Sequence, residues 1–506
     1  MDAESRGRRR TRRGGAAAAI SRDVNYRTLR NPFPPMNFCS DDEARSVHDA
    51  ALAILSEDGI KVLLPEARKI YAAGGATIND DMVHIGPEMV AEALRTAPRS
   101  FPMRAGTPDR DVVMELGALT FQPGAGCPHA TDLTRGRRPG TAQDYRELVQ
   151  ITQAFDVLHL IPPLVEAQDV PPALRHYEFM RTQLAYSDKV PFIYSRGPGQ
   201  VAESFEMLRD FRGLSDAEFA AEPHVYTIIN TNSPRQLDVP MARGVIDFAR
   251  HGQPSVITPF TLMGAMAPIT PSGAITLSHA EALAAITLGQ LANPGAPMMY
   301  GTFTSNVDMK SGAPAFGTPE HFRANLLAGQ MARLIGLPWR SATGSAANLG
   351  DVQAAHETQF GLWGCLLAGA TMVVHSAGWL EGGLTISYEK MITDLEVLQM
   401  VAELCTAAPL DTARDAVTEV LPGGHFFAAA HTMSRYQTEF YQPFTWDVSN
   451  FGTWTERGAV DTTTRATGIW QEVLTRPGPS VDTDRVAALD AYIAARTKAG
   501  GTPPES

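Results

Sequence analysis

The run HVYTIINTN, residues 224–232, carries an unbroken apolar stretch into small polar residues, and a segment with helical periodicity follows at 239–251. Apolar residues without polar alternation are typical of a strand that is covered on both faces. The same pattern occurs seven more times along the chain. The other runs are LTFQPG (119–124), VLHLIPP (157–163), VPFIYSR (190–196), PSVITPF (254–260), PMMYGTF (297–303), LPWRSATG (337–344) and TMVVHSAG (371–378).

Between these runs lie segments with the apolar spacing of helices, at 142–155, 172–185, 276–291, 319–335 and 351–368. Eight alternations of strand and helix predict an α/β fold, a (β/α)8 barrel with an N-terminal helical layer and a C-terminal extension. We expect a disordered Arg-rich tail over 1–30, a helical cap over 31–109, the barrel over 110–405 and the extension over 406–506. Ser40 and the three acidic residues after it predict the start of the first helix in the cap.

Composition narrows the choice of partners and compartment. Of the 506 residues, 44% are hydrophobic and 19% are charged, which is typical of a globular protein. The net charge of −12 divides into +4 for residues 1–13 and −16 for the rest, and an acidic body argues against nucleic acid. Four separated cysteines without a CxxC pair and no apolar run of about 18 residues predict a cytoplasmic protein that does not enter a membrane.

Barrel enzymes build their sites at the carboxyl ends of the strands. In this chain those positions hold aromatic, amide and hydroxyl side chains with few charges, a mixture that suits a methylated cation bound against aromatic faces. No P-loop and no HExxH motif occurs, so we expect neither a phosphate site nor a metal site. Lone histidines of the cap, His48 and His84, are predicted to be surface residues.

Three longer runs resemble one known family. They are LPWRSATGSAANLGDVQAAHET from Leu337, LLAGATMVVHSAGWLEGGLTISYEKMITD from Leu366 and GGHFFAAAHT from Gly423, together with the Arg-rich start. All resemble the trimethylamine methyltransferase family, the corrinoid-dependent methylamine methyltransferases. The resemblance implies a barrel that transfers a methyl group from a methylated amine to the cobalt(I) of a separate corrinoid protein, which docks over the barrel mouth. The cobalamin is then carried by the partner, no cofactor is tightly bound to this chain, and we expect a homo-oligomer.

The trimethylamine enzymes of archaea in this family carry pyrrolysine, whereas this chain has only standard residues. A quaternary amine leaves as a neutral tertiary amine when cobalt(I) attacks its methyl carbon, but trimethylamine would leave as an amide anion unless an electrophile captured it. The resemblance therefore implies a quaternary amine such as glycine betaine, as for relatives without pyrrolysine. Which amine is used and which molecule finally accepts the methyl group stay open.

The resemblance and the strand ends together suggest roles for particular residues. We expect Tyr300, Trp379 and either Phe303 or Phe121 to surround the trimethylammonium group. We expect the polar end of the substrate to be bound by His375, Asn230, Asn232 or Arg340. Either Glu381 or Glu166 is expected to offset the ammonium charge. Of these, His375 and Glu381 are the predicted catalytic residues.

Two other functions fit the sequence. The first is a barrel lyase or aldolase, which is weakened because no lysine lies at a strand end: Lys189 starts a predicted strand and Lys310 lies in a loop. The second is a betaine-binding or corrinoid-partner scaffold that performs no turnover.

Overall fold

The computed structural model describes residues 24–407 and 410–505, so the Arg-rich run of the predicted tail lies outside the described residues. The chain divides into two units. The larger unit is Asn25–Thr406 with Pro443–Ser506, and the smaller is Met1–Val24 with Ala407–Gln442. No helix in the described ranges is both long enough and apolar enough to span a membrane.

A ring of parallel strands forms the centre of the larger unit. Six strands lie in the order β7-β18-β17-β14-β12-β10. Their bounds are β7 (Ala118–Phe121), β10 (Thr227–Ile229), β12 (Ser255–Ile257), β14 (Met298–Gly301), β17 (Trp339–Ala342) and β18 (Met372–Val374).

The two remaining predicted strands close this ring with fewer hydrogen bonds. Leu160 bridges Val190, and Phe192 bridges Tyr226, both in parallel. The His159 N–H then donates to the carbonyl oxygen of Phe121 in β7 over 2.9 Å. Prolines at 162, 163 and 191 explain the short ladders here, because proline has no backbone N–H to donate.

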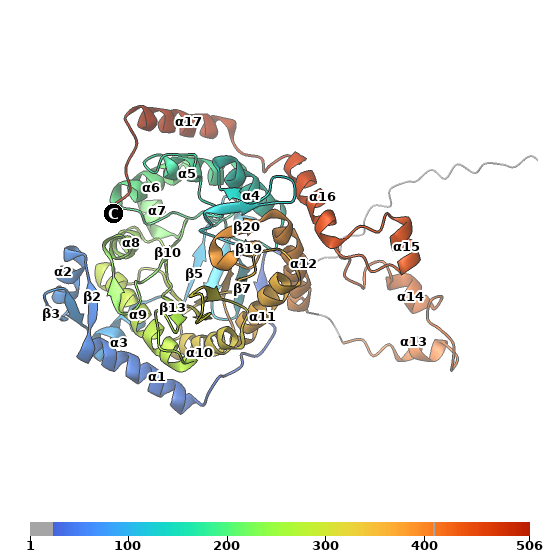
Figure 1. The fold of residues 1–506 in the computed structure, drawn as a ribbon, viewed down its shortest axis with the longest axis horizontal. Helices are drawn as coiled ribbons and strands as arrows, with labels where there is room; N and C mark the ends of the chain where they lie inside the picture. The colour runs from blue at the N-terminus through green and yellow to red at the C-terminus, as the bar shows by residue number, and fades with distance from the viewer. Residues whose placement is uncertain (1–23, 408–409, 506) are drawn as a thin grey trace, which may run out of the picture. The chain divides into compact units, whose positions relative to one another are not determined.

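Helices surround the strands, as Figure 1 shows. In chain order they are α4 (Ala142–Ala154), α5 (Arg175–Tyr186), α6 (Pro198–Arg212), α7 (Asp216–Ala221), α8 (Val239–Arg250), α9 (Pro271–Ala292), α10 (Pro319–Ile335), α11 (Val352–Ala368) and α12 (Tyr388–Cys405). Side-chain caps fix several of their starts, such as Thr141, which forms a capping box with Asp144 at α4. The predicted barrel is confirmed.

The N-terminal layer packs on one side of this barrel. It contains β1 (Leu29–Arg30), α1 (Asp41–Ala53), a π-helical turn (Ile54–Asp58), β2 (Ile60–Val62), α2 (Pro65–Ala73), β3 (Thr77–Asn79), β4 (Met82–His84), α3 (Pro87–Thr96), β5 (Ser100–Met103), a 3-10 turn (Pro108–Arg110) and β6 (Val112–Glu115). Ser40 caps α1 as predicted, in a capping box with Glu43. Helices α1, α2 and α3 all contact α9. Leu29 and Arg30, which we assigned to the tail, pair with β7.

His48, which we predicted to be a surface residue, is partly exposed and also contacts a barrel helix. His48 Nδ1 lies 2.8 Å from Nε2 of His279 on α9, and the His279 side chain is fully buried. The sequence could not show this contact because the two histidines are 231 residues apart.

Short strands at the carboxyl ends of the barrel strands shape the mouth. Phe260–Met263 (β13) pairs with Phe303–Val307 (β15), which also pairs with Pro314–Ala315 (β16). A second small sheet contains β8 (His129–Thr131), β9 (Arg138–Pro139), β19 (Trp379–Leu380) and β20 (Thr385–Ser387). Strand β11 (Gln236–Leu237) pairs instead with β2 of the N-terminal layer. The segment after Phe260 buries Leu262 and Met263 but exposes Ile269.

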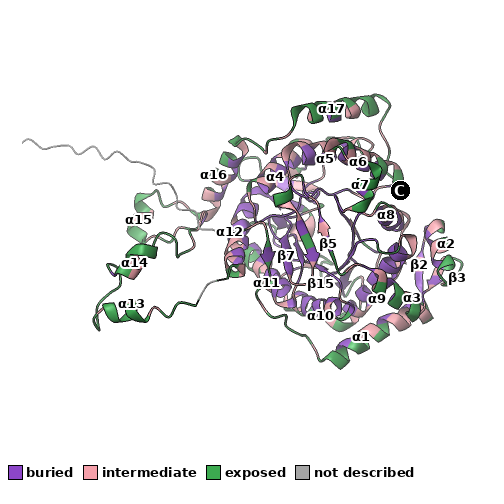
Figure 2. Ribbon diagram, turned by 180° about the vertical axis from the view of Figure 1, so that it is seen from behind, coloured by how far each residue is buried: buried purple, intermediate pink, exposed green. Residues whose placement is uncertain are grey.

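The C-terminal extension contributes to both units. In the larger unit α15 (Phe451–Glu456) is followed by α16 (Thr462–Thr475), which packs on α12 and α4, and by α17 (Thr483–Lys498), which packs on α5 and α6. The smaller unit holds α13 (Arg414–Glu419) and α14 (Ala430–Arg435). Figure 2 shows the buried strands inside the barrel and the exposed outer faces of α1 and α17.

Candidate functional site

A cavity of about 470 Å³ opens at the carboxyl ends of the barrel strands. This volume lies within the usual range for small-molecule sites. Five of the predicted site residues line it together: Asn230, Phe303, Arg340, His375 and Trp379.

Aromatic rings form one wall of the cavity. The Trp379 indole stacks on the His375 ring, with centroids 4.5 Å apart and planes 19° apart. Phe303 lies 5.2 Å from His375 and 5.9 Å from Trp379, and Phe260 lies 4.9 Å from Phe303. Because these rings come from loops and strands far apart in the sequence, only the closed barrel brings them together. Such ring faces attract a methylated cation.

Glycines fix the position of the Trp379 indole. A Cβ atom would lie 2.6 Å from the indole at Gly344, 2.5 Å at Gly383 and 3.1 Å at Gly124. Gly344 and Gly383 also have positive φ angles of 137° and 104°, which side chains rarely permit. Three of the glycines that mark strand ends in the sequence therefore make room for one tryptophan.

A buried guanidinium lies beside this aromatic wall. Arg340 in β17 is 2% exposed, its Cζ lies 5.1 Å from the Phe303 ring centroid, and its Nη1 donates to the carbonyl oxygen of Thr302 over 3.0 Å. In the described ranges no carboxylate forms an ion pair with Arg340, and its buried Nε has no hydrogen-bond partner. Burial lowers the pKa of Arg340 to about 9, so the group is still charged at pH 7.

His375 is neutral in this environment. Burial, together with the nearby charge of Arg340, holds the pKa of His375 well below its ordinary value. The backbone of His375 has a φ of 56°, a strained value for a residue with a side chain, and Thr343 donates to its carbonyl oxygen over 2.6 Å. Its buried Nδ1 has no partner among the described residues. The imidazole can therefore hydrogen-bond a ligand but adds no positive charge.

Sequence reasoning missed most of a further part of the cavity wall, which the third barrel strand supplies. Phe192 and Tyr194 face the cavity because alternate side chains of a strand point the same way. The Arg196 guanidinium lies 4.0 Å from the Tyr194 ring centroid and pairs with Glu166 over 2.6 Å. Although burial raises the pKa of Glu166, the charges of Arg196 and Arg175 hold it below the usual range. Alternation from Phe192 could have identified this wall.

Tyr300 and Phe121 do not line the cavity. The Tyr300 hydroxyl lies 3.1 Å from Nδ1 of His279 on α9, so this side chain points out of the barrel toward the helices. Phe121 is fully buried with its ring 6.2 Å from that of His159. We predicted both residues at the ammonium site because each lies near the end of a strand. Side chains alternate between the two faces of a strand, and Tyr300 lies on the face that points away from the cavity.

Asn232 and Glu381 make structural contacts nearby. Asn232 Nδ2 donates to Asp238, the N-cap of α8, over 3.0 Å. Glu381 pairs with Arg137 over 2.9 Å, an interaction that lowers the pKa of Glu381 although burial raises it. Neither residue lines the cavity, whereas Asn230 does.

A buried carboxylate that the sequence did not reveal organises the loop after β10. Glu281 on α9 is fully buried and accepts hydrogen bonds from the Ser233 hydroxyl (2.7 Å), the Arg235 N–H (2.7 Å) and the Thr231 hydroxyl. Of the polar run from Asn230 to Ser233, only Asn230 is thus left to face a ligand.

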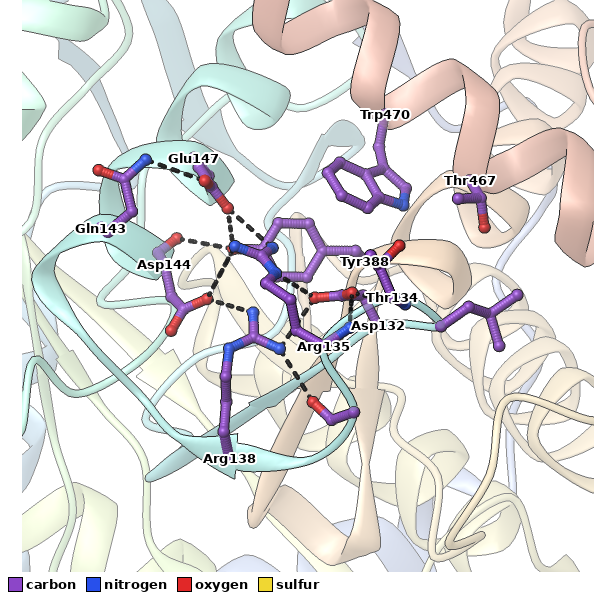
Figure 3. Close-up of polar contacts among 12 residues, drawn as sticks. Asp132, Thr134, Arg135, Arg138, Gln143, Asp144, Glu147, Tyr388, Thr467 and Trp470 are labelled. Atoms are coloured by element: carbon purple, nitrogen blue, oxygen red, sulfur yellow. Dashed lines mark hydrogen bonds and ion pairs between the residues drawn. The ribbon is translucent and has the colours of Figure 1, made fainter.

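An ionic network anchors the β8–β9 hairpin at the mouth. Arg135 binds Asp132 over 2.7 Å and Glu147 of α4 over 2.9 Å, and Tyr388 of α12 donates to Glu147 over 2.8 Å. Figure 3 shows these groups converging under Trp470 of α16. The Arg135 guanidinium also lies 4.9 Å from the Tyr388 ring centroid and 5.6 Å from that of Trp470, so the hairpin that carries Arg137 contacts α4, α12 and α16.

These features define a class: a (β/α)8 barrel whose strand ends hold a partly aromatic cavity with a buried cation, suited to a small charged molecule. A model of the family described as trimethylamine methyltransferase (MTTB) matches residues 4–501. The chain belongs to the trimethylamine methyltransferase family, and it is a methyltransferase.

Individual relatives cover almost the whole chain. It is 31% identical over 475 residues to the glycine betaine methyltransferase of Desulfitobacterium hafniense (strain Y51), covering 93% of this chain and 99% of that one. It is 28% identical over 470 residues to the trimethylamine methyltransferase MttB of Desulfitobacterium hafniense (strain DSM 10664 / DCB-2), covering 91% and 93%. Among solved structures, the Methanosarcina barkeri monomethylamine methyltransferase aligns with a TM-score of 0.49 at 9% identity, covering 86% of this chain and 89% of that one.

Proposed function

We propose that this protein transfers a methyl group from a small zwitterionic quaternary amine, such as glycine betaine, to the cobalt(I) of a corrinoid protein. The observation that carries the proposal is the buried Arg340 guanidinium, which lies beside an aromatic wall and forms no ion pair with a carboxylate of the described chain. A carboxylate on the substrate would complete its pairing.

The charge of Arg340 favours a zwitterion over a simple cation. Two unit charges about 5 Å apart repel by roughly 3 kcal/mol at an effective dielectric constant of about 20. A ligand with an ammonium group alone would meet this repulsion in the cavity, whereas a betaine carboxylate between the two cations cancels it. The neutral state of His375 keeps the cavity from gaining a further positive charge.

The residues of the chain act by positioning in this mechanism. Phe303 and Trp379 hold the methylated ammonium group, and Arg340, His375 and Asn230 hold the carboxylate. The corrinoid supplies a cobalt(I) nucleophile, and the tertiary amine departs neutral, so no general acid is needed. Because Phe303 and Trp379 are buried, the reacting carbon would meet apolar ring faces on this side.

A set of exposed apolar side chains suits a partner protein that covers the mouth. Leu133, Ile269, Met309, Leu349 and Leu384, which we call the apolar rim, are each 53% to 69% exposed. Each lies in a loop that follows a different barrel strand. Exposed apolar groups gathered around a cavity mark interaction sites. The rim fits the docking of a corrinoid protein.

The test is a methyl-transfer assay with cob(I)alamin and a panel of glycine betaine, proline betaine, carnitine, choline and trimethylamine. We expect the cobalt(I) absorbance to fall with a betaine, with stoichiometric release of the demethylated amine. A repeat with the cognate corrinoid protein separates the enzyme from a scaffold: binding of a betaine without turnover in that assay contradicts the proposal. Borohydride trapping tests the lyase, and labelling of a lysine in the presence of substrate would favour it.

A further inference from the structure

The residues that follow α17 return to the segment that carries Arg196, one of the residues lining the cavity. Figure 1 shows the chain running from α17 to its end beside α6. There the Thr502 N–H donates to the carbonyl oxygen of Ala173 over 3.0 Å, and the Glu505 N–H donates to the carbonyl oxygen of Arg196 over 2.9 Å. Arg196 lines the cavity, so this segment touches the backbone of a site residue.

Two glycines let the segment approach α6 closely. A Cβ atom at Gly197 would lie 2.7 Å from Cβ of Glu505, and one at Gly199 would lie 2.6 Å from Cγ2 of Thr502. In addition, Gln200 Nε2 donates to the carbonyl oxygen of Thr502 over 2.8 Å. The contact between residues 502–505 and the start of α6 therefore depends on hydrogen bonds and on the lack of side chains at Gly197 and Gly199.

The segment is also stiff and well anchored. Pro503 and Pro504 restrict the backbone between the two hydrogen-bonded ends. Upstream, Arg181 of α5 pairs with Asp490 of α17 over 2.6 Å, and the Tyr492 hydroxyl donates to Glu206 of α6 over 2.6 Å. The match to the family model ends at residue 501, immediately before these residues.

We propose that residues 502–505 form a strap that positions Arg196, and with it the Tyr194 wall of the cavity, for substrate binding. The strap fixes the carbonyl of Arg196, while Glu166 fixes its guanidinium from the other side. A loosened strap lets the loop 195–199 shift and weakens ground-state binding of the substrate. Because the proposed ammonium site is formed by Phe303 and Trp379 and not by Arg196, the methyl carbon stays aligned once substrate is bound. This inference rests on the proposed function only for its kinetic readout.

The experiment is a double-mutant cycle at Gly199 of α6 and Thr502 of the strap. Gly199→Ala adds one methyl group that meets Thr502 Cγ2 and otherwise suits a helix, and Thr502→Ser removes that Cγ2 while keeping the hydroxyl. We expect Gly199→Ala to raise the KM for the amine about three- to tenfold, the value of one hydrogen bond, with kcat within about twofold. Thr502→Ser alone should behave as wild type, and the double variant should restore the wild-type KM.

Hydrogen–deuterium exchange at residues 196–205 gives a readout that needs no turnover. We expect faster exchange there in Gly199→Ala and in a chain that ends at Gly501, with rescue in the double variant and an unchanged unfolding midpoint for Gly199→Ala. Unchanged exchange and KM in Gly199→Ala, or failure of Thr502→Ser to rescue them, would overturn the strap. A wild-type protein that transfers no methyl group contradicts the proposed function instead, since the exchange data stand alone.

Discussion

At the scale of single residues, the proposed ammonium site depends on the Trp379 indole. Trp379→Phe keeps an aromatic ring but reduces the electron-rich face, so we expect quaternary amine binding to weaken roughly three- to tenfold. Isothermal titration calorimetry with glycine betaine measures the change in affinity. The matched control is Trp470→Phe, because that indole lies in α16 and donates to Glu389 away from the cavity. Equal affinity for Trp379→Phe and wild type, with both folded, would remove Trp379 from the site.

Arg340 gives a prediction about selectivity. In Arg340→Met we expect affinity for glycine betaine to fall by about 2–5 kcal/mol, the usual effect of removing one partner of a buried charge pair. Choline, which has no carboxylate, should bind no worse than before, so the ratio of the two affinities is the measurement. The exposed Arg45→Met on α1 serves as the control. A parallel loss for both ligands would mean that Arg340 supports the cavity without reading the carboxylate.

The residue scale also shows what the sequence could and could not predict. That Trp379, His375 and Arg340 line one cavity could be predicted, because barrel topology places strand ends at one mouth. Tyr300 also lies at a strand end, but its side chain faces α9. Which face of a strand a side chain occupies depends on whether its position is odd or even along the strand, and the strand end alone does not show this. Glu281, 46 residues after Arg235 in the chain, has no local signal that could reveal its contact.

At the scale of elements, the eight strand and helix alternations were predictable because each follows from local periodicity. Their pairing partners at the mouth were not: β13 with β15 and β8 with β20 arise from loops whose extended pairing has no sequence pattern of its own. The caps at Ser40 and Thr141 follow from residue type, whereas the contact of α1 with α9 through His48 depends on the tertiary fold.

The loop between β10 and α8 yields a prediction for Glu281 of α9. Glu281→Gln keeps one carbonyl oxygen but places an NH2 group against hydroxyl and N–H donors. We expect a loss of about 1–3 kcal/mol in the free energy of unfolding and a raised KM, because Asn230 begins this loop. Urea unfolding and steady-state kinetics measure the two effects. The exposed Glu88→Gln on α3 is the control, and an unchanged stability would show that Glu281 does not hold the loop.

At the scale of the whole molecule, buried neutral histidines predict how stability depends on pH. Burial lowers the pKa of His159 and of His279 to about 3 and that of His321 to about 4. These folded-state values lie below the unfolded value of about 6.5. Their contribution to the free energy of unfolding is therefore fully present above pH 6.5. It is lost as the pH falls below 6.5, because in this range only the unfolded chain takes up protons.

Between pH 7.5 and 5.5 each of these histidines should lower the free energy of unfolding by about 1.4 kcal/mol, or about 4 kcal/mol for the three. Urea midpoints at the two pH values measure the change. His321→Gln should reduce the loss by about 1.4 kcal/mol, whereas the exposed His251→Asn should not alter it. A stability that is flat across this window would contradict the burial of neutral imidazoles.

The apolar rim allows partner docking to be tested apart from chemistry. A charge placed at the centre of a protein interface weakens association strongly, whereas a small free acceptor reaches the cavity without touching the rim. We therefore expect Met309→Asp to slow methyl transfer to the corrinoid protein roughly tenfold while leaving transfer to free cob(I)alamin unchanged. The comparison of the two acceptors with one enzyme preparation is the measurement.

The control for this substitution lies at the other end of the barrel. Leu404 is 53% exposed at the end of α12, and because the helices run antiparallel to the strands, it lies near their amino ends. Leu404→Asp adds the same charge at similar exposure and should leave both rates unchanged. If Leu404→Asp slowed transfer to the corrinoid protein and Met309→Asp did not, the partner would dock away from the mouth, and the methyl group could not pass directly from the cavity to the cobalt.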